Sequence, residues 1–189
     1  MRVLVVPVIA TVGLAGCSSG ATAGSGASEY SFTGATEAAH VINPADRAVA
    51  PPFEGELLDG TPFDSEELAG DIAVINFWGS WCAPCRVETP DLQAVYTEVR
   101  DQGVQFLGVD VKDDRQLARA FMSNVGAEYP SLFDPRGEVA LAFRGFPANV
   151  VPSTIVVDRE GRVAAVYTGA VSREDLRTAL TNLLKETGS

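Results

Sequence analysis

The sequence predicts an α/β fold in which helices cover a central sheet. Two continuous apolar segments, 72–78 and 104–110, have the composition of strands that are buried on both faces. Each is followed by a segment with helical features, and the chain closes with a hairpin and a last helix. Strands that alternate with helices in this way make an α/β sandwich.

The first elements of the predicted domain are short. Residues 56–63 form a small hairpin, because an Asp59-Gly60 turn separates its two arms. Residues 65–68 are predicted to form a short helix. The apolar segment 72–78 then supplies the first buried strand.

The middle of the domain alternates between helix and strand. A long helix is predicted over 83–101, and Gly103 ends it because helices favour a left-handed glycine just past their last turn. The buried strand 104–110 follows. Apolar residues then recur at helical spacing over 113–124, which predicts a second helix.

The C-terminal third completes the fold. Residues 138–143 are predicted to form a short helix, and residues 153–168 a hairpin around the turn at 158–161. Ser172 is the expected N-cap of a closing helix that reaches Glu186. This order matches the thioredoxin fold, with an N-terminal β-hairpin and a central helix-bearing insert added, in a domain over 51–189.

Residues 1–16 predict export from the cytoplasm. A basic start, a short apolar run and small residues before Cys17 describe a signal peptide. The run is shorter than the about 20 apolar residues that span a bilayer. Leu14-Ala15-Gly16-Cys17 resembles a bacterial lipobox, in which the cysteine is lipidated and becomes the mature N-terminus. The alternative is an ordinary signal peptide with an incidental cysteine.

Residues 17–50 predict a flexible linker. They are rich in Ser, Ala, Gly and Thr and have no sustained apolar period, so they cannot bury a core. His40 lies here and is expected to be solvated. The formal net charge of −11 and the lack of a basic run argue against nucleic acid or anionic lipid as partners. We expect a monomer.

Cys82 and Cys85 carry the chemistry that the sequence predicts. They stand where the first buried strand gives way to a helix, and one helical turn brings their sulfurs within bonding range. The unpaired N–H groups and the positive dipole end of a helix favour the reactive thiolate. We therefore interpret this Cys-x-x-Cys pair as a redox-active dithiol.

Other uses of a lone Cys-x-x-Cys fit less well. A zinc ribbon needs a second ligand pair, and the remaining Cys17 and His40 lie far upstream. A c-type haem site needs a histidine directly after the second cysteine, where Arg86 stands. A structural disulfide with so short a loop is unusual. We expect no metal and no cofactor.

The segment from Asn76 to Pro90 is similar, almost residue for residue, to the active-site signature of the TlpA/ResA-like extracytoplasmic thioredoxins. Residues 129–134 and 151–158 resemble later motifs of that family, and the likeness covers 50–186. The resemblance implies a thiol–disulfide oxidoreductase, lipid-anchored at the extracytoplasmic face of the cell membrane. It also implies that the protein reduces disulfides in secreted proteins, with apocytochrome c as the leading substrate and a membrane thiol carrier of the CcdA type as electron donor.

The expected roles follow the order of the motif. Cys82, first at the helix N-terminus, is the predicted exposed attacking thiolate, and the more buried Cys85 resolves the mixed disulfide. Trp81 offers the partner an apolar contact; a core aromatic is the alternative. By the resemblance, Pro152 is cis after Val151 and lets an incoming peptide pair with the preceding backbone. Without the resemblance, an ordinary trans turn proline fits equally.

Glu88 is the predicted proton-handling acid. Thioredoxin has a buried aspartate six residues before its first cysteine, but here that position is Asn76, which cannot take a proton. Glu88 lies three residues after Cys85, on nearly the same helix face, and resembles a glutamate that tunes the cysteines in the ResA-like group. We predict that it is partly buried and handles the proton of Cys85; a solvated surface carboxylate is the alternative.

Three competing functions differ in how well they fit. A peroxidase of this fold needs proline and threonine before its cysteine, where Ile75 and Gly79 stand. A copper chaperone of the Sco type needs a wider Cys-x-x-x-Cys spacing and a distal histidine. A disulfide-forming oxidase of secreted proteins uses the same parts as a reductase, so it stays open as the alternative.

Overall fold

The computed structural model describes residues 39–143 and 150–186, which form one mixed sheet with helices on both faces. The strands are β1 (Ala39–Val41), β2 (Glu54–Leu57), β3 (Pro62–Asp64), β4 (Ile72–Trp78), β5 (Val104–Val111), β6 (Ser131–Asp134), β7 (Ser153–Val157) and β8 (Val163–Thr168). The α-helices are α1 (Ala83–Val99), α2 (Arg115–Val125), α3 (Glu138–Ala142) and α4 (Arg173–Lys185). Short 3-10 helices are η1 (Pro44–Asp46), η2 (Ser65–Leu68) and η3 (Arg100–Gln102).

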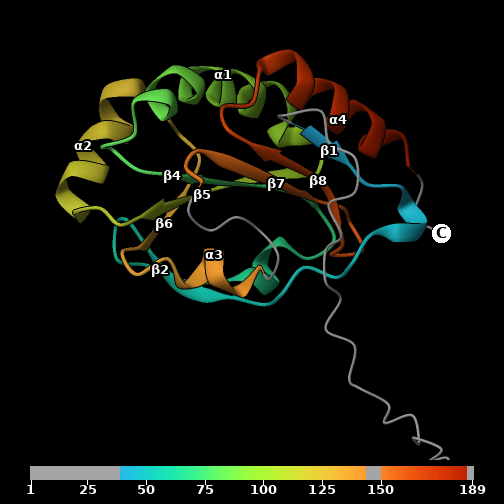
Figure 1. Cartoon of the computed structure of the whole chain (residues 1–189), viewed down its shortest axis with the longest axis horizontal. Helices are drawn as coiled ribbons and strands as arrows, with labels where there is room; N and C mark the ends of the chain where they lie inside the picture. Colours follow the sequence, from blue (N-terminus) through green and yellow to red (C-terminus); the bar gives the residue numbers. More distant parts are fainter. Residues whose placement is uncertain (1–38, 144–149, 187–189) are drawn as a thin grey trace, which may run out of the picture.

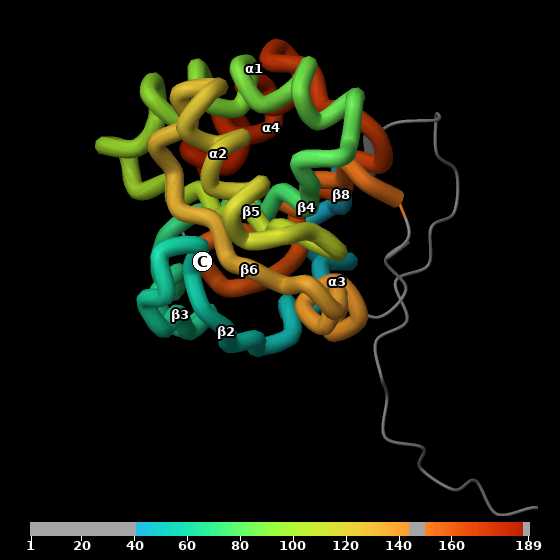
Figure 2. Tube along the Cα trace, turned by 90° about the vertical axis from the view of Figure 1, so that its left-hand side faces the viewer, coloured from blue at the N-terminus to red at the C-terminus, as the bar shows by residue number. Residues whose placement is uncertain are grey.

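The sheet forms the middle of three layers. Its strand order is β1-β8-β7-β4-β5-β6-β2-β3. Helices α1, α2 and α4 cover one face, and α3 lies on the other with the β2–β3 hairpin nearby (Figures 1 and 2). β4 pairs parallel with β5 and antiparallel with β7, so it sits in the centre of the sheet. The predicted α/β sandwich, its N-terminal hairpin and its helix-bearing insert are confirmed.

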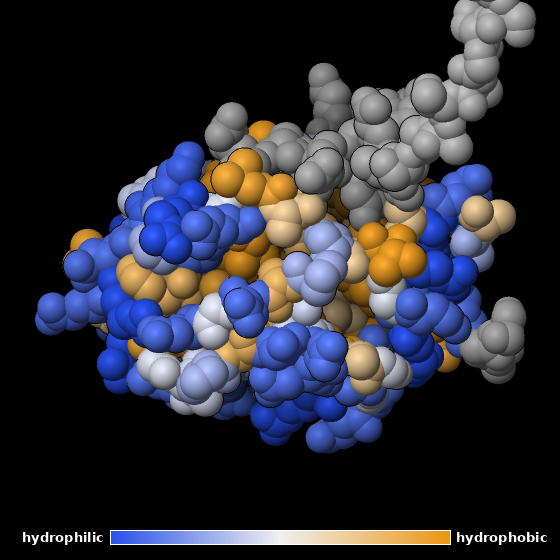
Figure 3. Space-filling view, turned by 90° about the horizontal axis from the view of Figure 1, so that it is seen from below, coloured by the Kyte–Doolittle hydropathy of each residue, from blue (hydrophilic) through white to orange (hydrophobic). Residues whose placement is uncertain are grey.

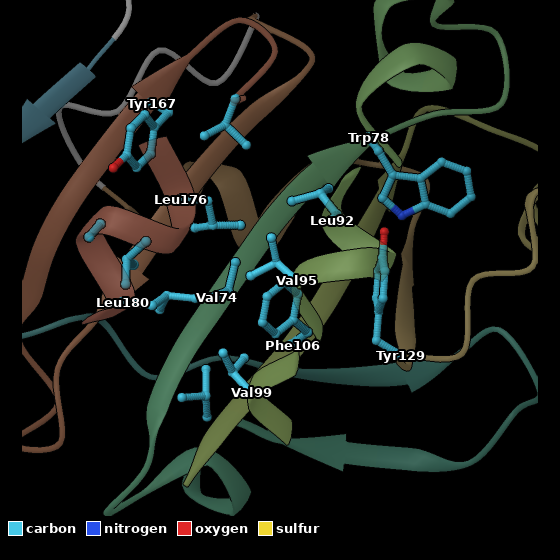
Figure 4. Packing of buried hydrophobic residues seen from close by; sticks show 14 of the residues in the cluster. Val74, Trp78, Leu92, Val95, Val99, Phe106, Tyr129, Tyr167, Leu176 and Leu180 are labelled. Atoms are coloured by element: carbon cyan, nitrogen blue, oxygen red, sulfur yellow. The ribbon is translucent and has the colours of Figure 1, made fainter. Parts of the chain in front are cut away.

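β4 is apolar throughout because it faces a core on both sides. Val74 and Trp78 belong to the cluster under α1 and α4, whereas Phe77 belongs to the cluster on the opposite face. Figure 4 shows the first cluster, in which side chains from two helices meet those of β4 and β5. Its labelled members include Val74, Leu92, Val95, Phe106, Leu176 and Leu180.

The opposite face has its own apolar centre. Figure 3 shows hydrophobic side chains gathered in the middle of this face, with hydrophilic ones around them. A cavity of about 330 Å³ is lined by apolar residues of this layer, among them Phe53, Leu68 and Ile75. Burial on both faces therefore holds β4 in register and fixes the position of the turn that begins at Gly79.

The helix boundaries agree closely with the sequence-based prediction. α1 ends at Val99 and continues as η3, and Gly103 then adopts a left-handed φ of 73°. α2 begins one residue after Asp114, whose side chain accepts hydrogen bonds from two backbone N–H groups. Ser172 caps α4 as predicted, by accepting from the Asp175 N–H.

Residues 39–50 belong to the folded domain, which differs from the flexible linker expected over 17–50. β1 pairs with β8, and Ala50 donates its N–H to Gly161. Arg47 is buried and pairs with Asp158 at 3.1 Å and with Glu186 at 2.6 Å. Backbone pairing and a buried ion pair need no apolar period, so the composition did not predict them.

The predicted signal peptide over 1–16, Cys17 and residues 17–38 of the expected linker lie outside the described residues. Among the helices that the structure describes, none is both long and apolar enough to cross a bilayer.

Candidate active site

The two cysteines lie where β4 passes into α1, and they form a disulfide. The sulfurs are 2.02 Å apart and the Cα atoms 5.3 Å apart. Cys82 is the N-cap of α1, and its Sγ accepts the N–H of Cys85 at 3.2 Å. Pro84 stands in the first turn, where a missing N–H costs no hydrogen bond. The positive end of the helix therefore points at the sulfur of Cys82.

The prediction that Cys82 is exposed is wrong for this disulfide form. Cys82 is 3% exposed and Cys85 is 0% exposed, so only their order of accessibility was right. The Cys82 side chain folds back over the helix N-terminus to reach the Cys85 N–H, which withdraws it from solvent.

Trp81 is an exposed aromatic beside the disulfide. Its side chain is 53% exposed, so the core interpretation is wrong, and its indole Nε1 donates to the Val111 carbonyl at 3.2 Å. Gly79 makes this placement possible. A Cβ at that position would lie 2.5 Å from the Trp81 Nε1, so any larger residue displaces the ring.

The turn before Cys82 is held by the segment between β5 and α2. The Asp113 carboxylate accepts the Ser80 N–H at 2.5 Å and the Ser80 hydroxyl at 3.0 Å. Burial opposes ionisation of Asp113, but these bonds and the Asp114 N–H lower its pKa. On the outer side, Arg86 donates to the Ser80 carbonyl at 2.9 Å.

A groove of about 700 Å³ extends from this turn along α2. Trp81, Leu117 and Phe121 supply apolar walls, and Arg86 and Lys112 supply the cationic groups of its lining. Leu117 is exposed like Trp81, so both apolar surfaces are available to another molecule.

Glu88 is buried one turn after Cys85, and only 1% of it is exposed. Its Oε1 accepts from the Asn76 Nδ2 at 3.0 Å, and its Oε2 accepts from the Val171 N–H at 3.0 Å. Burial raises the pKa of Glu88 to about 7, and these two hydrogen bonds limit the rise. The surface interpretation is thus wrong, and the burial is deeper than predicted.

Asn76 connects Glu88 to the sheet. Its Nδ2 also donates to the Thr154 hydroxyl at 3.0 Å, while its Oδ1 has no partner among the described residues. The acid is therefore carried by the helix, and a neutral amide occupies the strand position below it.

The Val151–Pro152 peptide bond is cis, as the resemblance implies. Gly169 donates to the Pro152 carbonyl at 2.9 Å, which ties this loop to the end of β8. Within the described residues, the backbone N–H and C=O of Val151 make no hydrogen bond. Val151 packs against both apolar clusters.

Sequence reasoning missed Asp110 and Asp113. Asp110 is 0% exposed near the end of β5, and neither of its carboxyl oxygens accepts a hydrogen bond from a donor among the described residues. Burial raises its pKa to about 8, and the nearby charge of Asp113 adds to the rise. The available signal was an acidic residue within the apolar segment 104–110.

Comparisons with known proteins agree with this geometry. Residues 47–166 match the model of the AhpC/TSA family. The chain is 31% identical over 136 residues to the thiol-disulfide oxidoreductase ResA of Bacillus subtilis, covering 72% of this chain and 74% of ResA. It is 34% identical over 128 residues to the thiol:disulfide interchange protein HelX of Rhodobacter capsulatus, covering 67% and 69%.

Solved structures are similar over more of the chain. A secreted thiol-disulfide isomerase from Corynebacterium glutamicum has a TM-score of 0.75 and 35% identity, covering 78% of this chain and 92% of that structure. A DsbF homologue from Corynebacterium diphtheriae has a TM-score of 0.77 and 34% identity, covering 82% and 98%. The cysteine pair thus sits in a fold that these proteins share.

Proposed function

Since the chain belongs to the AhpC/TSA family and is a thiol–disulfide oxidoreductase, similar to ResA, we propose that it reduces disulfides outside the cytoplasm. The observation that carries this proposal is the buried Glu88, one helical turn from Cys85. Disulfide formation in secreted proteins is the second candidate.

The proposed reaction proceeds in two steps. The Cys82 thiolate attacks a substrate disulfide, so a mixed disulfide forms and one substrate thiolate leaves. Cys85 then loses its proton to Glu88 and attacks the Cys82 sulfur, which releases the second substrate thiolate. Two electrons pass from the dithiol to the substrate, and Cys82 and Cys85 end as the disulfide. Glu88 suits the proton transfer because its pKa of about 7 is close to ambient pH.

The charge around the cysteines favours reduction over oxidation. A strong oxidant stabilises its reduced form, chiefly as a thiolate. Here a buried carboxylate lies on the same helix face as Cys85 and disfavours a second negative charge. Of the two cations that line the groove beside this turn, Arg86 and Lys112, Arg86 is bonded to the Ser80 carbonyl. The helix N-terminus stabilises the Cys82 thiolate, and the Glu88 carboxylate opposes a thiolate at Cys85; the proposal of a reductase takes the second effect as the larger one.

Substrate recognition is proposed at two places, the groove that Trp81 lines and the backbone of Val151. Trp81 and the groove beside it would receive side chains of the disulfide-bearing polypeptide, since the groove is continuous with the redox turn. The backbone groups of Val151, which make no hydrogen bond to the described residues, would pair with an extended segment of that polypeptide, next to Pro152. These contacts use shape and backbone, so they suit several secreted substrates.

The cellular setting is proposed from the sequence. Signal peptide 1–16 would direct export, and lipidated Cys17 would hold the domain at the extracytoplasmic face of the membrane. Electrons would come from a membrane thiol carrier of the CcdA type, and apocytochrome c is the leading substrate; both rest on the resemblance to the TlpA/ResA-like family.

The second candidate, a disulfide-forming oxidase of secreted proteins, is favoured by the likeness to the structure named a secreted thiol-disulfide isomerase, from Corynebacterium glutamicum. The reduction potential of the Cys82–Cys85 couple separates the two. We would measure it in a thiol buffer with the Cys17→Ser variant, so that one couple titrates. A value near or below about −230 mV supports the reductase, and a value near about −120 mV overturns it in favour of the oxidase.

A further inference from the structure

Asp110 has no part in the reaction described above, yet its burial needs an explanation. It lies in β5 directly opposite Trp78 of β4 and Phe133 of β6, between two aromatic neighbours. Asp110 is fully buried, and neither of its carboxyl oxygens accepts a hydrogen bond from a donor within the described part of the chain. An ionised carboxylate without partners is costly in such a site, so this position favours the neutral acid.

The charged groups around Asp110 reinforce this preference. Asp113 and Asp114 approach from the segment before α2, and Asp134 approaches from β6. Burial is the largest cause of the raised pKa of Asp110, and the charges of these three residues add to it. Two cations lie on this side: Arg115 lies 4.4 Å over the Phe133 ring and pairs with Glu56 at 2.9 Å, and Lys112 lines the groove together with Asp113 and Asp114.

Asp113 connects Asp110 to the redox site. Lys112, between them, has a left-handed φ of 54°, a conformation that non-glycine residues rarely adopt. This bend places the Asp113 carboxylate against the N–H and the hydroxyl of Ser80. Ser80 is two residues before Cys82, whose own N–H donates to Gly79 across the same turn. Asp113 thus clamps the turn that leads to the attacking sulfur.

We propose that Asp110 is a positioning residue of the redox site, which acts through Asp113 and Ser80 on Cys82. The Asp110 and Asp113 side chains lie within hydrogen-bond reach of each other, so as a neutral acid Asp110 donates to the Asp113 carboxylate and supports the clamp. As an anion it repels that carboxylate and loosens the hold on Ser80. The turn before Cys82 is therefore ordered when Asp110 carries its proton and loosens when the proton is lost, whichever direction electrons flow.

The first test follows the Ser80 amide by NMR in the oxidised protein, between pH 5 and 9.5. No cysteine of the Cys82–Cys85 pair titrates in that form, so the result does not depend on substrate or on the proposed reducing direction. We expect the Ser80 amide shift to show an inflection near pH 8. The inflection should vanish in Asp110→Asn and persist in Asp101→Asn, an exposed matched control. An identical Ser80 titration in Asp110→Asn and the wild type overturns the proposal.

The second test measures disulfide exchange at Cys82 across the same pH range. The rate of Asp110→Asn relative to wild type should rise three- to tenfold between pH 6.5 and pH 9, because only the wild type loses its clamp. A purely structural role for Asp110 would shift the rate by one constant factor at every pH, which also overturns the proposal.

A third measurement needs no variant and covers the case in which Asp110→Asn fails to fold. The ¹³C shift of the Asp110 carboxyl carbon reports its titration directly in the wild-type protein. A midpoint well above pH 6 supports the proposal, and a midpoint near pH 4 overturns it. Asp113→Asn removes the facing charge and should lower that midpoint by at least half a pH unit.

Discussion

Two buried carboxyl groups lie on the same face of the sheet, and the chain treats them in opposite ways. Glu88 accepts one hydrogen bond at each oxygen, from Asn76 and from the Val171 N–H. Asp110 accepts none from the described residues and faces other carboxylates. Both pKa values are raised. The pKa of Glu88 is about 7, so both of its protonation states are populated at neutral pH, whereas the pKa of Asp110 is about 8, so its protonated form predominates there.

The difference shows that hydrogen-bond donors give two similar buried carboxyl groups different roles. A buried carboxyl with two fixed donors can exist in either state at neutral pH, so it can give and take a proton during exchange. A buried carboxyl without donors keeps its proton at neutral pH and loses it only at higher pH, so it acts through the neighbour that it supports. The first arrangement suits chemistry, and the second suits positioning.

Glu88→Gln tests the proton-exchanging member of this pair and should produce the largest effect, on the rate at which a mixed disulfide is resolved. Glutamine keeps the shape but cannot accept the Cys85 proton, so resolution of a trapped mixed disulfide should slow about 100-fold at pH 7.5. The wild-type rate should rise through pH 7 as Glu88 loses its proton, and the variant should lack that inflection. Rapid quenching with alkylation of free thiols measures both.

Glu66→Gln is the matched control, because Glu66 is exposed and far from the cysteines in the chain. It should resolve the mixed disulfide at the wild-type rate. Equal rates and equal pH profiles in Glu88→Gln and Glu66→Gln would contradict the role proposed for Glu88.

Besides its effect on disulfide exchange at Cys82, Asp110→Asn should change the stability of the protein. The raised pKa means that the native state holds a proton which the unfolded chain releases, so the unfolding free energy of the wild type falls as pH rises from about 4 to about 8. The maximum slope is about 1.4 kcal/mol per pH unit, and partial relaxation should leave about 2 kcal/mol between pH 5 and pH 8. Asp110→Asn should therefore be the more stable protein at pH 8.

Urea denaturation of the oxidised proteins at pH 5 and pH 8 measures this difference, with Asp101→Asn as the control. A stability difference between wild type and Asp110→Asn that is the same at both pH values would show that Asp110 does not titrate between them.

The contrast between these acids also marks what could be predicted from the sequence. β4 and the Cys-x-x-Cys pair were predictable because a doubly buried strand and a helix N-terminus have local signatures. Glu88 was found because helical spacing places it on the face of Cys85. Asp110 was not, because the pleat of β5 and the missing donors depend on strands distant in the sequence. The same limit hid Arg47, whose partners Asp158 and Glu186 lie more than 100 residues away.

Gly79→Ala should produce the smallest effect, and it tests the proposed recognition surface, which consists of Trp81, the groove beside it and the backbone of Val151. The added Cβ would meet the Trp81 indole at 2.5 Å, so the ring must leave the Val111 carbonyl and the edge of the groove. We expect KM for a disulfide-bearing polypeptide to rise about tenfold, consistent with the loss of one aromatic contact worth about 1.4 kcal/mol. The rate with a small aromatic disulfide should stay within twofold of the wild-type rate, because that reagent does not fill the groove.

Trp81→Phe keeps a ring but removes the N–H, so its KM should lie between those of the wild type and Gly79→Ala. An unchanged KM in Gly79→Ala, with a shifted tryptophan fluorescence that shows the ring has moved, would remove Trp81 from the recognition surface and leave the backbone of Val151 as the proposed substrate contact.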